Sequence, residues 1–154
     1  MECSDTTRTI FALLVAHRRV LGDSSPTQDD TDRVFETHGP VIERCVAQGK
    51  PLHAILPAFP CKSPSSSKVL GRLPDGAERQ SLTFLDDLFR CIAAVHAPGA
   101  RLTICSDGRV FADCLDVPDD DISAYRDALA AMCATEGLRH IDFFQLEDVA
   151  GYSR

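Results

Sequence analysis

The sequence predicts an α/β protein with a Rossmann-like, three-layer domain and a mainly parallel sheet. Short apolar runs alternate with longer segments whose apolar residues recur at helical spacing. The chain has 154 residues, 44% of them hydrophobic, which suits a single globular core. The order strand, helix, strand, helix, strand favours parallel strands joined by right-handed crossovers. We expect an N-terminal helix and loop over residues 1–31 and the main domain over residues 32–154.

Two helices are expected before the first strand. Residues 8–21 carry apolar side chains at helical spacing, and a Gly-Asp-Ser-Ser-Pro stretch follows them. Residues 22–31 are expected to form a loop. A second helix is expected over residues 32–48, divided at Gly39–Pro40 because an internal proline removes a helical hydrogen bond.

The main domain is expected to alternate strands with helices. The helical segment over residues 78–97 has the widest apolar stripe, and Pro98–Gly99 closes it. The loop over residues 60–75 contains three prolines and four serines, which disfavour helix and sheet, and loops of this length are often functional. The other expected elements are strands over residues 52–59, 101–106 and 139–146 and a helix from Pro118 to Gly137.

Charge and cysteine content limit the possible functions. The net charge of −7 argues against a nucleic-acid partner, which would need clustered Lys and Arg. The seven cysteines are odd in number and form no C-x-x-C pair, so we expect reduced core residues. The sequence shows neither a signal peptide nor an apolar run of membrane-spanning length, and we expect a cytoplasmic protein without a membrane partner.

Cationic and polar side chains follow the first two expected strands. The first loop contains LPAFPCKSP over residues 56–64 and KVLGRLPD over residues 68–75, and the second begins with SDGRVFAD over residues 106–113. Because the loops after parallel strands leave from the same edge of the sheet, these segments should converge. We expect catalytic roles for Lys62, Asp107 and Arg109, and binding of a phosphate or carboxylate by Lys62, Ser63, Lys68, Arg72, Ser106 and Arg109.

Each of these residues also has a plainer interpretation. Lys62 and Lys68 could be solvated surface lysines, and Ser106–Asp107–Gly108 could be an ordinary turn. Cys61 lies beside Lys62, which could lower the pKa of its thiol, although a small packed thiol is the commoner case.

Neither a metal-ligand motif nor a nucleotide-binding motif gives strong support for a function. His140–Ile141–Asp142 matches the H-x-D ligand pair of non-haem iron sites, but no histidine follows it to complete the set. The chain has neither the G-x-x-x-x-G-K-[ST] nor the G-x-G-x-x-G fingerprint of nucleotide binding.

The segments LPAFPCKSP, KVLGRLPD and PGARLTICSDGRVFADCLDV together resemble the pyoverdine/dityrosine biosynthesis family, the isocyanide or isonitrile synthases. The resemblance extends over about residues 50–148. It implies conversion of the amine of an amino acid to an isonitrile in secondary-metabolite biosynthesis, with ribulose 5-phosphate as carbon donor and no metal or organic cofactor. The implied route runs from condensation of the amine with the sugar ketone through proton transfers, phosphate loss and carbon–carbon cleavage.

The resemblance also raises alternatives. Members of the family continue beyond the third strand, so we expect a chain that is incomplete at its C-terminus, with an uncovered sheet edge that promotes self-association. The chain could then be an inactive partner or regulatory subunit of a longer homologue. A dityrosine-type enzyme that makes an N-formyl amino acid is another possibility, as is a generic sugar-phosphate-binding protein.

Overall fold

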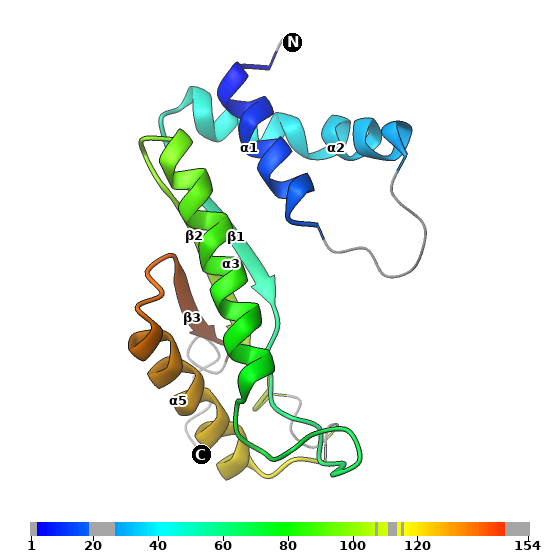
Figure 1. The fold of residues 1–154 in the computed structure, drawn as a ribbon, viewed down its shortest axis with the longest axis vertical. Coiled ribbons are helices and arrows are strands. Elements are labelled where there is room, and N and C mark those ends of the chain that lie inside the picture. The colour runs from blue at the N-terminus through cyan, green and yellow to red at the C-terminus, as the bar shows by residue number, and fades with distance from the viewer. Residues whose placement is uncertain (1–2, 19–26, 107, 111–113, 115, 147–154) are drawn as a thin grey trace. The chain divides into compact units, whose positions relative to one another are not determined.

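The computed structural model describes residues 3–18, 27–106, 108–110, 114 and 116–146. Its contacts divide the chain into two compact units, residues 1–53 with 87–101 and residues 54–86 with 102–154. None of the helices in the described ranges is both long and apolar enough to cross a membrane. The elements are α1 (Asp5–Ala16), α2 (Gln28–Ala47), β1 (Leu52–Pro57), α3 (Gly76–Val95), β2 (Ala100–Ser106), α5 (Asp119–Glu136) and β3 (Ile141–Gln145), labelled in Figure 1.

The three strands form a parallel sheet in the order β1-β2-β3. β2 and β3 pair in parallel, and the register runs from Leu102 opposite Ile141 to Ser106 opposite Gln145. Between β1 and β2, the Leu52 N–H donates to the Gly99 carbonyl at 3.0 Å and the Ala58 N–H to the Cys105 carbonyl at 3.3 Å. In both hydrogen bonds the partners are 47 positions apart in the sequence, and such a constant separation along two strands is that of a parallel pair. The α/β fold class with a parallel sheet is therefore confirmed.

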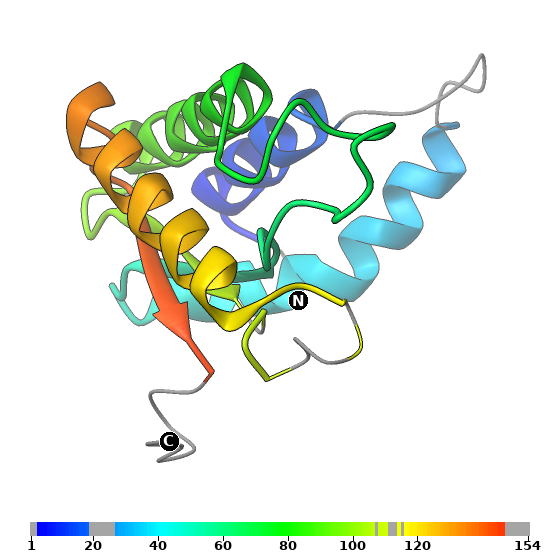
Figure 2. The same ribbon diagram turned by 90° about the horizontal axis from the view of Figure 1, so that it is seen from below.

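In the second unit, α5 and the first half of α3 lie side by side over one face of the sheet (Figure 2). Alternate residues of β2 face inward, because successive side chains of a strand point to opposite faces. On the other face, the side chain of Ile55 of β1 is 67% exposed. The core of this unit includes Leu82, Leu102, Ile104, Ile122, Tyr125, Leu129 and Ile141, all buried.

In the first unit, α1 packs against α2 (Figure 1). The rings of Phe11 and Phe35 meet edge to face with 4.8 Å between their centroids. The helix α1 starts at Asp5, three residues before the predicted start, because the Ser4 side chain caps it. Ser4 is itself fixed by Glu43 of α2, whose carboxylate accepts hydrogen bonds from the Ser4 N–H at 2.8 Å and hydroxyl at 2.9 Å.

The predicted division of the second helix at Gly39–Pro40 is wrong. α2 continues through Pro40 from Gln28 to Ala47, and a reciprocal hydrogen-bonded cap between Thr27 and Asp30 begins it. Pro40 lies on the exposed side of the helix, where water can satisfy the carbonyl that loses its donor. The loop expected up to residue 31 therefore ends before Gln28.

The cysteines are free thiols, but the expectation of core residues holds fully only for Cys133, since Cys114 is exposed and the other five are partly exposed. The structure describes all seven, and they form no disulfide. Cys133 is buried on α5, and burial, with a further contribution from the charge of Asp86, raises the pKa of its thiol to about 11. A thiol with so high a pKa stays protonated and unreactive near neutral pH.

Candidate functional site

The loops that follow β1 and β2 meet at one edge of the sheet. The Ser106 hydroxyl donates to the Phe59 carbonyl at 3.5 Å, across 47 positions of sequence. The backbone of the first loop also passes close to Gly108, where an added Cβ would lie 2.3 Å from the Pro60 carbonyl oxygen. Only glycine permits this approach. The convergence of the two motifs expected from a parallel sheet is thus confirmed at Phe59, Pro60, Ser106 and Gly108.

Lys62 projects from the first loop into a cluster of carboxylates. Its Nζ lies 2.6 Å from Oε1 and 2.8 Å from Oε2 of Glu78, and 3.1 Å from Oδ2 of Asp75. The Lys62 side chain is only 11% exposed. Burial alone would lower the pKa of Lys62, but the hydrogen bonds and charges of Glu78 and Asp75 outweigh it, and the pKa is raised. The ammonium therefore stays protonated near neutral pH.

Glu78, near the start of α3, accepts hydrogen bonds from three directions. Besides the Lys62 ammonium, the Asp75 N–H donates to it at 2.9 Å and the Tyr125 hydroxyl at 3.2 Å. Tyr125 is buried on α5, and burial, followed by the charge of Glu78, raises the pKa of its hydroxyl. Asp75 is held by the Ala77 N–H as well as by Lys62, and both lower the pKa of its carboxyl group. The cluster of Lys62, Asp75, Glu78 and Tyr125 thus joins the first loop to α3 and α5.

Arg109, in the second loop, turns toward α5. Its guanidinium donates to the Ser123 hydroxyl, and its side chain is partly buried. Asp107, for which we predict a catalytic role, lies outside the described residues. The second loop therefore contributes Ser106, Gly108 and Arg109 to the described site.

The remaining predicted binding residues lie farther out on the first loop. Arg72 is 70% exposed and pairs with Asp121 at the start of α5, with 2.8 Å between Nη1 and Oδ1. Lys68 is exposed, and Ser63 is partly buried, with its hydroxyl accepting from the Ser65 N–H at 3.2 Å. An open pocket of about 350 Å³ in this loop is lined by Leu70, Gly71, Arg72, Leu73 and Asp75.

The H-x-D segment is not part of a metal cluster in the described portion of the chain. There, no group of three His, Cys, Asp or Glu side chains lies close enough to hold a metal ion. The backbone N–H of His140 donates to the buried Asp86 carboxylate at 2.7 Å, which anchors the start of β3 to α3. Asp142 is exposed on β3.

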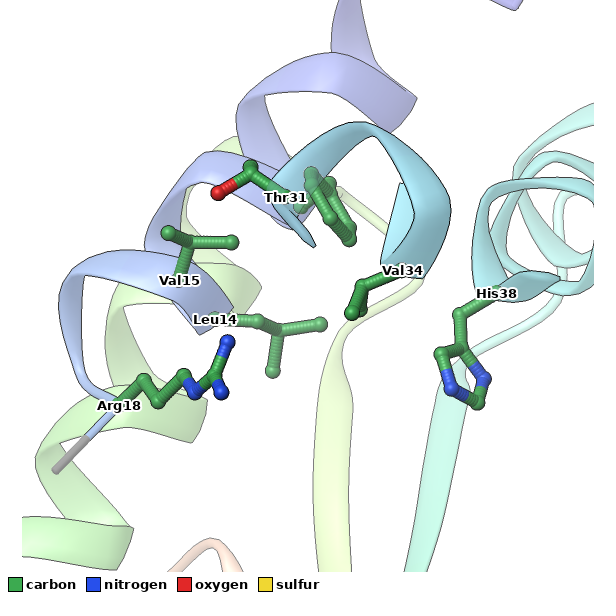
Figure 3. Close-up of a pocket in the computed structure, with 7 residues that line it drawn as sticks. Leu14, Val15, Arg18, Thr31, Val34 and His38 are labelled. Atoms are coloured by element: carbon green, nitrogen blue, oxygen red, sulfur yellow. The ribbon is translucent and has the colours of Figure 1, made fainter. Parts of the chain in front are cut away.

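A separate pocket of about 350 Å³ lies in the first unit, between α1 and α2. Figure 3 shows Leu14 and Val34 facing each other across it, with Arg18 and His38 at its margin. Nothing in the sequence analysis pointed to this pocket. Its lining is almost wholly apolar, so it lacks the converging polar groups that an amino-acid or sugar-phosphate site requires.

The sequence analysis also missed the roles of Glu78 and Tyr125. Neither residue is among the site residues that the sequence predicts. One local signal was available: Asp75 and Glu78 are three residues apart just before an apolar stripe, which is the spacing of a helix capping box. The contact of Glu78 with Lys62 carries no comparable local signal, because it spans 16 positions of sequence.

Comparison with known proteins identifies the family. Residues 42–154 match the sequence profile of the pyoverdine/dityrosine biosynthesis protein family. The chain belongs to this family. The matched range contains both loops of the site.

The relatives of the chain include isonitrile synthases. It is 44% identical to the L-tyrosine isonitrile synthase of Pseudomonas aeruginosa over 147 residues, which cover 94% of this chain and 45% of the relative. It is 42% identical to an L-tryptophan isonitrile synthase of Fischerella ambigua over 134 residues, which cover 86% of this chain and 41% of the relative. The crystal structure of PvcA from Pseudomonas aeruginosa matches with a TM-score of 0.89 and 41% identity, over 97% of this chain and 49% of that one. The chain spans about half the length of these relatives.

Proposed function

We propose that the chain takes part in isonitrile synthesis, in which the amine of an amino acid acquires a carbon atom from ribulose 5-phosphate. The observation that carries the proposal is the 44% identity to an L-tyrosine isonitrile synthase over 94% of this chain. Support comes from the meeting of the two motif loops, which places cationic and carboxylate side chains at the edge of a parallel sheet.

In this proposal the cations of the two loops bind the anionic groups of the substrates. Arg109 is partly buried and contacts Ser123, and its planar guanidinium suits a phosphate or a carboxylate. Lys68 and Arg72 are exposed and would supply charge at the entrance, with Ser63 and Ser106 as hydroxyl ligands. Asp107 would exchange protons with the substrate. No organic cofactor or metal is required in this proposal.

An isotope experiment tests the proposed reaction. Purified protein is incubated with ¹³C-labelled ribulose 5-phosphate and, in turn, each common amino acid, and the products are analysed by mass spectrometry. We expect an isonitrile that carries one labelled carbon from the sugar. Arg109→Ala should abolish the product, whereas Arg90→Ala, at an exposed residue of α3 that pairs with Asp87, should retain it. A folded protein that gives no labelled isonitrile with any amino acid contradicts the proposal.

A second candidate function is that of a binding partner for a longer homologue. The exposed apolar side chain of Ile55 on β1 favours it, because exposed apolar surface tends to promote association. A catalytic unit with an intact site should be stabilised against heat by ribulose 5-phosphate, because a ligand that binds only the native state raises its stability. If the chain shows no such response yet binds a full-length relative in size-exclusion chromatography, the partner function is favoured.

A further inference from the structure

The Lys62 ammonium is surrounded by carboxylate oxygens inside the protein and donates hydrogen bonds to Glu78 and Asp75. A lysine ammonium has three N–H donors. The structure places three carboxylate oxygens around Nζ: Oε1 and Oε2 of Glu78 at 2.6 and 2.8 Å and Oδ2 of Asp75 at 3.1 Å. With two hydrogen bonds to carboxylates, a third carboxylate oxygen within 2.6 Å and a side chain only 11% exposed, the ammonium is directed toward Glu78 and Asp75 and not toward solvent.

Glu78 is the centre of this cluster. It is buried, and it connects the Lys62 ammonium, the Asp75 backbone N–H and the Tyr125 hydroxyl. These donors come from the first loop, the residue before α3, and α5. Removal of Lys62 from this arrangement would leave a buried carboxylate without its counter-charge, which is strongly unfavourable.

We propose that Glu78 is the positioning residue of the site and that Lys62, held by Glu78, anchors the first loop instead of binding phosphate or reacting with substrate. This replaces the catalytic role that the sequence suggested for Lys62. The inference rests on the proposed function only because the anchored loop carries Ser63, Lys68 and Arg72, the side chains assigned there to the substrate anion.

The protonation state of Lys62 agrees with this role. Its raised pKa, the net result of burial opposed by Glu78 and Asp75, keeps the amine protonated near neutral pH. A protonated amine has no lone pair with which to accept a proton or to condense with the ketone of a pentulose phosphate. Lys68, in the same loop, is exposed and serves as a natural comparison.

Lysine acylation resolved by residue tests the proposal without any need for turnover. The folded protein is treated briefly with an amine-acylating reagent over a range of alkaline pH, and the extent of modification at Lys62 and Lys68 is read by mass spectrometry. We expect Lys62 to react at least about tenfold more slowly than Lys68, which corresponds to an opening free energy of only about 1.4 kcal/mol. Glu78→Gln removes the charge that holds the ammonium and should narrow this difference, with the rate at Lys68 unchanged.

A second variant and a reduction experiment complete the test. If circular dichroism shows that Glu78→Gln does not fold, Tyr125→Phe, which removes a single donor to Glu78, should give a smaller change in the same direction. Borohydride reduction in the presence of ribulose 5-phosphate should leave no sugar adduct on Lys62. Equal acylation of Lys62 and Lys68 in the wild-type protein, an unchanged ratio in a folded Glu78 variant, or a reduced imine at Lys62 would each overturn the proposal. A failure to form isonitrile would count against the proposed function alone.

Discussion

The approach of Gly108 to Pro60 gives the sharpest prediction about the site. In Gly108→Ala the new Cβ would stand 2.3 Å from the Pro60 carbonyl oxygen, 2.9 Å from its carbonyl carbon and 3.2 Å from Cγ2 of Ile122. Two of these atoms belong to the backbone, so no side-chain rotation relieves the contact. Overpacking of this kind costs about 1–3 kcal/mol, and we expect the upper part of that range because a backbone segment must move.

Urea denaturation of Gly108→Ala against wild type measures this cost, and Gly71→Ala is the matched control. Gly71 lies in the first loop, has no neighbour within 4 Å of an added Cβ and is not among the glycines with positive φ. For a protein of this size the expected loss corresponds to a melting temperature lower by roughly 2–4 °C per kcal/mol. Equal stability of Gly108→Ala, Gly71→Ala and wild type would show that the two loops do not meet as described.

Three other predictions concern stability and association. The pKa of the Cys133 thiol is raised from 9.0 to about 11, so its contribution to stability is present below pH 9.0 and is lost as the pH rises to about 11; Cys133→Ala should flatten the alkaline fall in denaturation free energy. Pro40→Ala should restore a helical hydrogen bond in α2 and raise the free energy of unfolding by roughly 1–3 kcal/mol in urea titrations. We also expect the isolated chain to self-associate, and Ile55→Lys should shift its elution in size-exclusion chromatography toward the monomer because it places a charge on the exposed face of an edge strand.

The sequence predicted the order of the main elements because each has a strong local pattern. The apolar stripe of α3 was recognised in the main: Leu82, Leu88, Phe89 and Ile92 are buried, whereas Leu85 is partly exposed and Val95, at the end of the helix, is 41% exposed. The start of α1 and the continuity of α2 were harder. The N-cap of α1 at Ser4 is a local signal, but the hydrogen bonds that fix Ser4 to Glu43 are not encoded locally, and the continuity of α2 depends on the exposed position of Pro40.

The meeting of the two motif loops at the sheet edge could be predicted from the sequence, but the contacts of individual side chains could not. Parallel strands bring their following loops to one edge, and this rule was enough to predict that the two motifs meet. The partners of individual cations were not predictable. The Lys62 ammonium turns to Glu78 and Asp75, and the Arg109 guanidinium to Ser123, because the packing of α3 and α5 decides which polar groups lie within reach. The roles of Lys68, Arg72 and Asp107 remain predictions.

A binding titration with ribulose 5-phosphate tests the central claim, that the two loops form one site for a phosphorylated sugar. Calorimetry should detect binding of ribulose 5-phosphate to the wild-type chain, and ribulose without the phosphate should bind far more weakly, because charge-assisted contacts to phosphate are then missing. Arg109→Ala should lose this preference for the phosphorylated sugar, while Arg90→Ala keeps it. Equal affinity for ribulose and ribulose 5-phosphate, or an unchanged preference in a folded Arg109→Ala protein, would contradict the assignment of the site.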